Sequence, residues 1–101
     1  RTLRARERLP MLRSTAYDGR FAVPTFDEVL ALVARRARET GRAIGVYPET
    51  KHPSYFRALG LPLEEPLVAA LRGAGLDRAD APVLIQSFEV GNLERLRGMT
   101  R

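Results

Sequence analysis

Residues 44–53 read Ile-Gly-Val-Tyr-Pro-Glu-Thr-Lys-His-Pro, an apolar run that ends in a carboxylate, an ammonium and an imidazole. Lys51 and His52 are the only lysine and histidine of the 101-residue chain, and both lie within three positions of Glu49. Side chains alternate along a strand with a period of two, so Glu49 and Lys51 would share a face if the strand continued through Thr50. The stretch predicts a strand that delivers a carboxylate and a cation to one side of its C-terminal end.

A helix is predicted before this strand, over residues 25–40. Thr25 can cap its first amides, and Glu28, three residues later, can complete a capping box. Gly41 supplies the stop. Apolar residues recur at helical spacing and predict a buried stripe formed by Phe26, Val29, Leu30, Val33 and Ala37.

The chain after residue 53 repeats the alternation of helix and strand. Residues 54–60 are too short for more than a turn or two of helix. A full helix is predicted over 64–73, a second strand of continuous apolar character over 83–88, and a third full helix from 89 to about 97. The apolar side of that last helix is predicted to consist of Val90, Leu93 and Leu96.

The N-terminal part carries weaker signals. A short helix followed by a loop is predicted in residues 1–13, because Pro10 would interrupt a longer helix. Asp18 and Gly19 are typical of a turn, and residues 21–23 are expected to be extended.

The order of elements predicts an α/β fold. Apolar strands joined by connections long enough for crossovers favour βα units, with residues 42–48 pairing in parallel with residues 83–87. Two strands would leave bare edges. We therefore expect one domain that is an interior slice of a larger (β/α) protein, with a loop or insertion region over 1–20 and about two to three βα units over 21–101.

Composition narrows the classes of function. The net charge of +5 and a pI near 10.7 invite a nucleic-acid-binding interpretation, but acidic residues are interspersed and aromatic residues do not alternate with basic ones. No apolar run approaches the length of a membrane-spanning helix. The absence of cysteine excludes disulfides, thiolate metal ligands and a cysteine nucleophile.

Polar residues follow both predicted strands. In parallel α/β proteins chemistry gathers at the C-terminal ends of strands, where Glu49, Lys51, Gln86 and Ser87 would lie. A glutamate can give an oxygen ligand to Mg²⁺ or Ca²⁺, and a lysine can neutralise a phosphate as a point charge. The alternative is a surface Glu–Lys ion pair, which contributes only about 0–1 kcal/mol.

Neighbouring residues allow two interpretations each. His52 could act as a general acid or base, or be a structural or exposed loop residue. Ser87 lacks the flanking glycines of a nucleophile elbow and is expected to cap a helix. Tyr55 and Phe56 are candidates for packing or for one wall of a pocket above the strands.

Three stretches together resemble a known family: Val-Pro-Thr-Phe-Asp-Glu-Val at 23–29, Gly-Val-Tyr-Pro-Glu-Thr-Lys-His-Pro at 45–53, and Leu-Ile-Gln-Ser-Phe at 84–88. Their order and spacing resemble the glycerophosphodiester phosphodiesterase family, particularly its periplasmic or secreted bacterial branch, over about residues 14–97. The resemblance implies a TIM barrel that hydrolyses glycerophosphodiesters to glycerol 3-phosphate and an alcohol, with Ca²⁺ or Mg²⁺ holding the phosphate.

The resemblance assigns roles to two residues of this chain and leaves the other roles of the family's site without a matching residue. Glu49 matches the family's metal-binding glutamate and Lys51 its phosphate-contacting lysine. The family's two catalytic histidines, in a His-Arg-Gly stretch and a His-Asp motif, and its Glu-x-Asp metal ligands have no counterpart here, and His52 matches neither histidine. We therefore expect no catalytic residue in this chain, which alone should be inactive, and an active phosphoric diester hydrolase as the parent protein.

Two alternatives from other classes remain open. One is a non-catalytic α/β interaction module, associated through exposed strand edges as an oligomer or a swapped assembly, in which Glu49 and Lys51 are a loop ion pair. The other is an arginine-rich piece that binds nucleic acid. By resemblance the expected location is periplasmic or secreted, with a cytoplasmic location also open.

Overall fold

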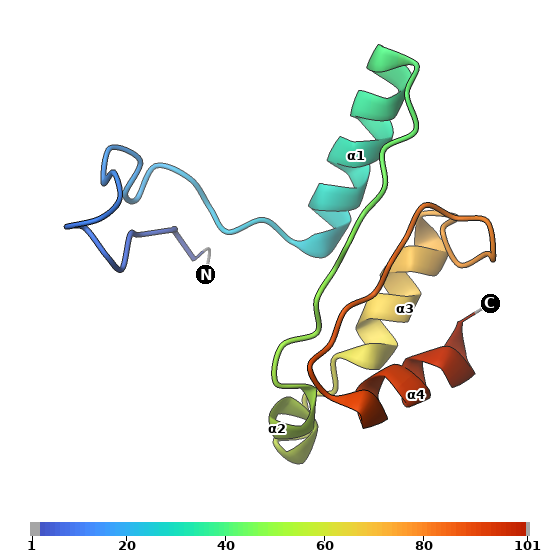
Figure 1. Ribbon diagram of the computed structural model, residues 1–101. Coiled ribbons are helices and arrows are strands. Elements are labelled where there is room, and N and C mark those ends of the chain that lie inside the picture. Colours follow the sequence, from blue (N-terminus) through green and yellow to red (C-terminus); the bar gives the residue numbers. More distant parts are fainter. Residues whose placement is uncertain (1–2, 101) are drawn as a thin grey trace.

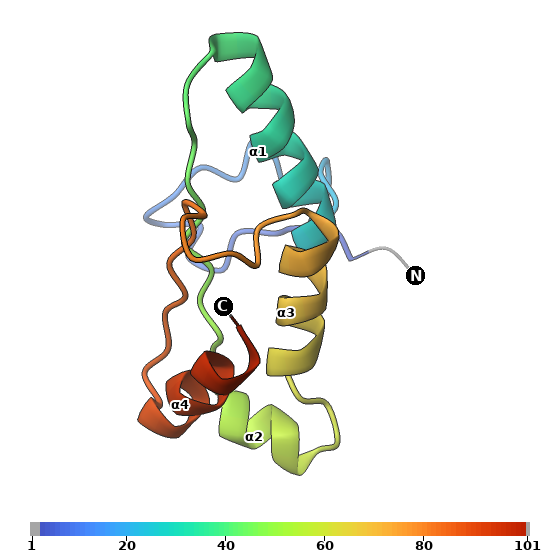
Figure 2. The ribbon, with the colours of Figure 1, turned by 90° about the vertical axis from the view of Figure 1, so that its right-hand side faces the viewer.

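A computed structural model describes residues 3–100 of the chain. Its helices are α1 (Phe26–Thr40), α2 (Pro53–Ala58), α3 (Glu64–Gly73) and α4 (Val90–Met99). Helix α3 packs against both α1 and α4. Two extended segments run side by side and connect the helices (Figures 1 and 2).

Helix α1 confirms the predicted capping box. The Oγ1 atom of Thr25 accepts a hydrogen bond from the amide of Glu28 at 3.2 Å, and Oε2 of Glu28 accepts one from the amide of Thr25 at 2.7 Å. Gly41 ends the helix in the left-handed region, with φ of 64°. The predicted stripe is also confirmed, because Leu30 is buried and its four other members are half-buried.

The core lies between three helices. Helix α3 has the predicted bounds, and its inward residues join one residue each from α1 and α4. The buried apolar residues are Leu30, Leu67, Val68, Leu71 and Leu96. Val46, Val83 and Ile85 of the extended segments pack against this cluster. The helices therefore cover one face of the extended pair.

Helix α4 confirms the predicted inward face only in part, because Leu96 is buried in the core but Val90 is exposed. Val90 is 71% exposed and Leu93 is 36% exposed, whereas Asn92 and Leu96 are both buried. Apolar spacing indicated Val90 and Leu93 as inward residues, whereas the structure buries the polar Asn92 beside Leu96. The side chain of Asn92 accepts a hydrogen bond from Thr50, a partner 42 positions earlier in the chain.

The extended segments are parallel, as predicted. The first extended segment (residues 44–51) pairs with the second extended segment (residues 82–88) through parallel bridges between Val46 and Val83 and between Glu49 and Gln86. Figure 1 shows both segments running toward the end of the molecule that carries α2 and the start of α4. The C-terminal ends of the two segments therefore meet at the same edge.

The prediction of regular strands is wrong, because among the described residues only isolated bridges join residues 42–48 and 83–88. Pro48 lies between the two bridges and has no amide hydrogen, so it accepts a bond from Gln86 at 2.9 Å but donates none. The ladder resumes where the amide of Thr50 donates to Gln86 O at 3.0 Å. A two-stranded pair interrupted in this way gains little independent stability.

Gly45 is required where the two segments first pair. A Cβ atom added to Gly45 would lie 2.9 Å from the carbonyl oxygen of Pro82, a distance that demands a backbone shift. The next amide, that of Val46, donates to the same oxygen at 2.9 Å. A side chain at Gly45 would therefore push against the first hydrogen bond of the parallel pair.

The N-terminal part does not form the short helix predicted over residues 1–13. The described residues of that range are extended or turned, and residues 1 and 2 lie outside the described part. Arg4 instead forms an antiparallel bridge with Ala22, and its Nη1 atom donates to Gly19 O at 3.1 Å. Pairing with the extended segment after the predicted turn replaces a helix that Pro10 would have cut short. Figure 1 shows this arm projecting away from the helices.

Helices long and apolar enough to cross a membrane do not occur between residues 3 and 100.

Candidate functional site

Burial alternates along the first extended segment. Its odd-numbered residues are exposed and its even-numbered residues are half-buried or buried. The exposed set is Gly45, Tyr47, Glu49 and Lys51. Because strand side chains alternate between two faces, these residues lie on the face turned away from the helices.

Glu49 and Lys51 therefore lie on one exposed side, at the C-terminal end of the parallel pair. The backbone of Glu49 is fixed by its bridge to Gln86. Among residues 3–100, neither the carboxylate nor the ammonium takes part in an ion pair. Both residues are exposed to solvent.

Thr50, between these two residues, has the opposite environment. It is 5% exposed, and its Oγ1 atom donates to Oδ1 of Asn92 at 2.6 Å. The carbonyl oxygen of Thr50 accepts from Oγ of Ser87 at 3.4 Å. Neither Thr50 nor Asn92 was predicted as a functional residue, although the alternation that turns Glu49 outward also turns Thr50 inward.

His52 makes the turn between the first extended segment and α2. It is exposed and holds the left-handed region, with φ of 51° and ψ of 49°, the one non-glycine residue of the described chain with positive φ. Its carbonyl oxygen accepts from the amide of Phe56 at 3.2 Å, while its imidazole makes no capping hydrogen bond. His52 contributes to the structure through its backbone, which turns the chain into α2. A left-handed histidine is uncommon enough to indicate a constrained turn.

Ser87 does not cap α4 as predicted. The N-cap residue is Glu89, whose amide donates to Oγ of Ser87 at 3.2 Å. The serine hydroxyl therefore bridges the start of α4 and the carbonyl of Thr50. The preference of serine for local amides was predicted, but the helix begins two residues later than a Ser87 cap would place it.

Tyr55 and Phe56 lie in α2 with their rings in edge contact, with centroids 5.3 Å apart and planes at 79°. Tyr55 is 61% exposed and Phe56 is half-buried. A cavity of about 190 Å³ beside them is lined by their neighbours Ser54 and Arg57 rather than by the two rings.

That cavity lies among polar groups of α2, α3 and α4. Its remaining lining residues are Glu64, Glu89, Gly91, Asn92 and Arg95. Two buried nitrogen atoms at it, Nε of Arg57 and Nδ2 of Asn92, have no hydrogen-bond acceptor among the described residues. Unpaired buried donors carry a desolvation cost of about 1–3 kcal/mol each.

Glu64 is the charged centre of this cluster. Its side chain is 2% exposed, and its Oε2 atom accepts from Nη2 of Arg57 at 2.8 Å. Nε of Arg95 lies 3.6 Å from the other carboxylate oxygen. A glutamate this deeply buried requires such partners, because an uncompensated buried charge is strongly unfavourable.

The pKa of Glu64 lies below its ordinary value of 4.5. Burial is the largest single influence and acts to raise this pKa, but it is outweighed by hydrogen bonding from the residue's own amide, by the nearby Asn92 amide and by Arg57. The Asn92 amide acts through proximity, because its Nδ2 atom does not reach hydrogen-bond geometry with an acceptor. Glu64 is therefore held ionised.

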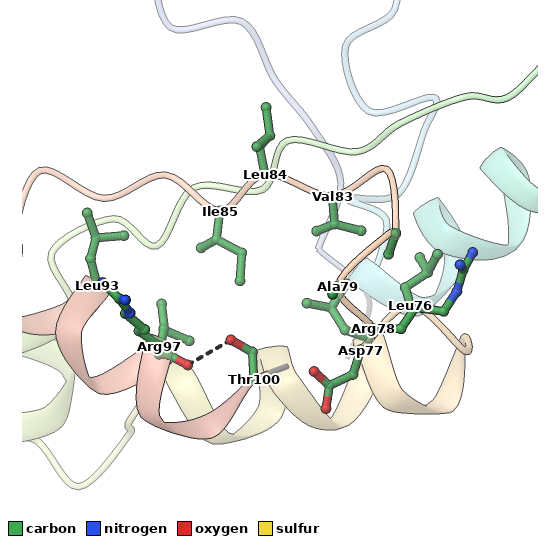
Figure 3. Close-up of a pocket in the computed structure, with 13 residues that line it drawn as sticks. Leu76, Asp77, Arg78, Ala79, Val83, Leu84, Ile85, Leu93, Arg97 and Thr100 are labelled. Carbon is green, nitrogen blue, oxygen red and sulfur yellow. Dashed lines mark hydrogen bonds between the residues drawn. The ribbon is translucent and has the colours of Figure 1, made fainter.

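A larger cavity of about 280 Å³ lies on the helix side of the extended pair. Val83 and Ile85 point into it, whereas Leu84 points away, toward the exposed face (Figure 3). Arg78, Asp77 and Arg97 lie among its lining residues. Since the cavity lies behind the pair, it is separate from the face that carries Glu49 and Lys51.

The described residues offer a divalent cation too few ligands for a complete site. No group of three or more His, Asp or Glu side chains between residues 3 and 100 is placed to hold a metal ion. Glu49 is one exposed carboxylate, and its charge has no ion-pair partner among residues 3–100. Residues 3–100 therefore offer Glu49 as one member of a ligand set.

No protein-family model matches the chain. Three curated proteins similar to it are all named as glycerophosphodiester phosphodiesterases. Glycerophosphodiester phosphodiesterase GDPD6 of Arabidopsis thaliana is 32% identical over 112 residues, covering 99% of this chain and 29% of the relative. The glycerophosphodiester phosphodiesterase of Haemophilus influenzae is 26% identical over 84% of this chain and 23% of its own length. That of Treponema pallidum is 27% identical over 76% and 22%. The chain thus spans less than a third of the length of each of these relatives.

Proposed function

We propose that this chain is part of a glycerophosphodiester phosphodiesterase, and that the whole protein hydrolyses glycerophosphodiesters to glycerol 3-phosphate and an alcohol. The names of the plant and bacterial relatives support the family. The observation that carries the proposal is the parallel pairing of the two extended segments, which brings Glu49 and Lys51 to one exposed face at the C-terminal edge. Parallel α/β proteins place their chemistry at that edge.

The proposed architecture is a (β/α)₈ barrel of which this chain supplies about two to three βα units. Helices cover one face of the parallel pair, as they cover the outside of such a barrel. The other face exposes apolar side chains, with Tyr47 67%, Leu84 70% and Phe88 84% exposed. In a closed barrel that face would point to the interior and be buried.

Glu49 and Lys51 have different proposed roles, one in metal binding and the other in phosphate binding. Glu49 would supply one oxygen ligand to a divalent cation, Ca²⁺ or Mg²⁺, and the remaining ligands would come from outside the described residues. When bound, the cation would polarise the phosphoryl oxygens. Lys51 would hold the phosphate by its point charge and offset the negative charge that develops in the transition state.

Proton transfer is not assigned to this chain. His52 turns the backbone in the left-handed region and has no partner for its imidazole in the described part of the molecule. The resemblance places the acid and base histidines in motifs that this sequence does not contain, so we propose that they come from other parts of the protein. A periplasmic or secreted location is proposed on the resemblance alone.

The test is release of glycerol 3-phosphate from glycerophosphocholine by the full-length protein in the presence of Ca²⁺. Glu49→Gln keeps the size of the side chain but removes its charge, and activity should fall at least about 100-fold. Glu94→Gln, an exposed change on α4, is the matched control and should leave activity unchanged. Full activity in Glu49→Gln would remove this residue from the site.

A further inference from the structure

The residue that fixes the proposed ligand segment is Thr50, whose side chain faces away from the site. Its hydroxyl donates to Oδ1 of Asn92 at 2.6 Å, and its amide donates to Gln86 O at 3.0 Å. Both Thr50 and Asn92 are 5% exposed. A short hydrogen bond between two buried side chains therefore ties the first extended segment to a helix 42 positions later in the chain.

Helix α4 is also attached to the far end of the connection between the first extended segment and α2. Oε2 of Glu89, the residue before α4, accepts a hydrogen bond from the amide of Ser54 at 3.2 Å. Lys51 and His52 thus lie between two attachments, from Thr50 to Asn92 in the first turn of α4 and from Ser54 to Glu89 at its N-cap. The start of α4 therefore determines the path of the chain from residue 50 to residue 54.

Asn92 lines the same cavity as the buried Glu64, and the polar groups there are incompletely paired. Glu64 is 2% exposed, and buried nitrogen atoms of Arg57 and Asn92 lack acceptors among the described residues. Well-packed apolar side chains in place of a buried charged group are often neutral or stabilising. Among residues 3–100, the one hydrogen bond of the Asn92 side chain is the one that its Oδ1 atom accepts from Thr50, so this bond is what joins the helix to residues 49–51.

We propose that Asn92 and Thr50 are positioning residues that fix the backbone of residues 49–51, so that Glu49 and Lys51 project together from the exposed face; this rests on the proposed function. Strand side chains change face with each residue, so the hydroxyl that anchors Thr50 inward is what holds both neighbours outward. The pair acts through Glu49 and Lys51 and contacts no reacting atom.

Accurate placement of these two groups has a large effect on rate. A displacement of about 1 Å can cost about 100-fold when reacting groups must be aligned. Residues that orient metal ligands from behind commonly cost about 10–100-fold in metal affinity or activity when they are changed. The hydrogen bond from Thr50 is suited to this role because it lies directly between the two proposed ligand residues.

The experiment compares Thr50→Val with Thr50→Ser in the full-length protein. Valine keeps the shape of threonine and removes the hydroxyl, whereas serine keeps the hydroxyl. Thr50→Val and Asn92→Ala should each speed amide hydrogen exchange in the peptide covering residues 46–56 by about fivefold. Both should lower kcat/KM for glycerophosphocholine and weaken Ca²⁺ binding by about tenfold. Thr50→Ser should stay close to wild type.

The controls separate this proposal from the proposed function. Glu94→Gln, an exposed change on the same helix, should alter neither exchange nor activity. If the wild-type protein neither binds Ca²⁺ nor hydrolyses glycerophosphocholine, the proposed function fails, while the exchange measurements still decide whether Asn92 anchors residues 49–51. If the wild type is active and Thr50→Val matches it in kcat/KM, the positioning role is overturned, whatever the exchange shows. Equal behaviour of Thr50→Val and Thr50→Ser would overturn it as well.

Discussion

Replacing Glu64 by glutamine tests whether the buried carboxylate between α2 and α4 is stabilised as an anion. The substitution keeps nearly the same shape and removes the charge that Arg57 contacts at 2.8 Å and Arg95 at 3.6 Å. Hydrogen bonds to charged groups contribute about 1.5–3 kcal/mol, and a lost one leaves its partner unsatisfied. Arg57 also contacts Glu65 at 3.1 Å and keeps some exposure to water, which limits the loss. We expect Glu64→Gln to lower the free energy of unfolding by about 2 kcal/mol near neutral pH.

The effect should depend on pH in a defined direction. The pKa of Glu64 in the folded chain lies below its ordinary value of 4.5. A carboxyl group with a lowered folded-state pKa stabilises the fold above its unfolded-state pKa, and loses that contribution as pH falls through the folded-state pKa. The difference in stability between wild type and Glu64→Gln should therefore be full near neutral pH and shrink in acid below pH 4.5.

Urea denaturation of the full-length protein, followed by circular dichroism at several pH values, measures this difference. A loss of about 2 kcal/mol should lower the urea midpoint by about 0.5 M, because the m-value rises with protein size and the matched relatives are more than three times as long as this chain. Glu65→Gln is the matched control, because Glu65 contacts the same arginine but is 51% exposed, and it should leave the midpoint nearly unchanged. Equal shifts in both variants, or a Glu64→Gln deficit that persists unchanged in acid, would refute the argument that burial makes this carboxylate important.

Two further substitutions test local structure. Gly45→Ala should destabilise the protein by about 1–3 kcal/mol and speed hydrogen exchange at Val46, because the new Cβ atom would lie 2.9 Å from Pro82 O; an unchanged urea midpoint and exchange rate would contradict the close approach. Thr25→Ala should cost about 1 kcal/mol by removing the cap of α1, and Thr25→Ser, which keeps the hydroxyl, should recover most of that loss in the same denaturation assay.

The sequence by itself determined the helices and the direction of the pairing. The start of α1 was predictable because Thr25 and Glu28 satisfy each other's amides within four residues, and the end was predictable because glycine accepts the left-handed conformation at position 41. Parallel pairing followed from the alternation of helices with apolar runs, and the bridge between Val46 and Val83 confirms it. These features depend on interactions between residues close in the chain, or on a repeating pattern.

The predictions that failed depended on partners far away in the sequence. A short N-terminal helix was expected, but Arg4 pairs with the extended segment at Ala22. Regular strands were expected, but the missing amide hydrogen of Pro48 divides the ladder into isolated bridges. The apolar runs were predicted at the correct positions. The hydrogen bonds between them determined that they form isolated bridges and not regular strands.

The candidate site also combines features that local sequence predicts with contacts that only the folded chain reveals. The sequence placed Glu49 and Lys51 at the end of an apolar run, on one face by alternation, and the family resemblance gave them proposed roles. Only the tertiary structure revealed that Thr50 between them donates a hydrogen bond to Asn92, because apolar spacing predicts Leu96 as an inward residue of α4 but gives no signal for a buried asparagine. A charged residue that faces solvent can be recognised from local sequence, whereas the buried polar contact that orients it joins positions 42 residues apart and exists only once the chain has folded.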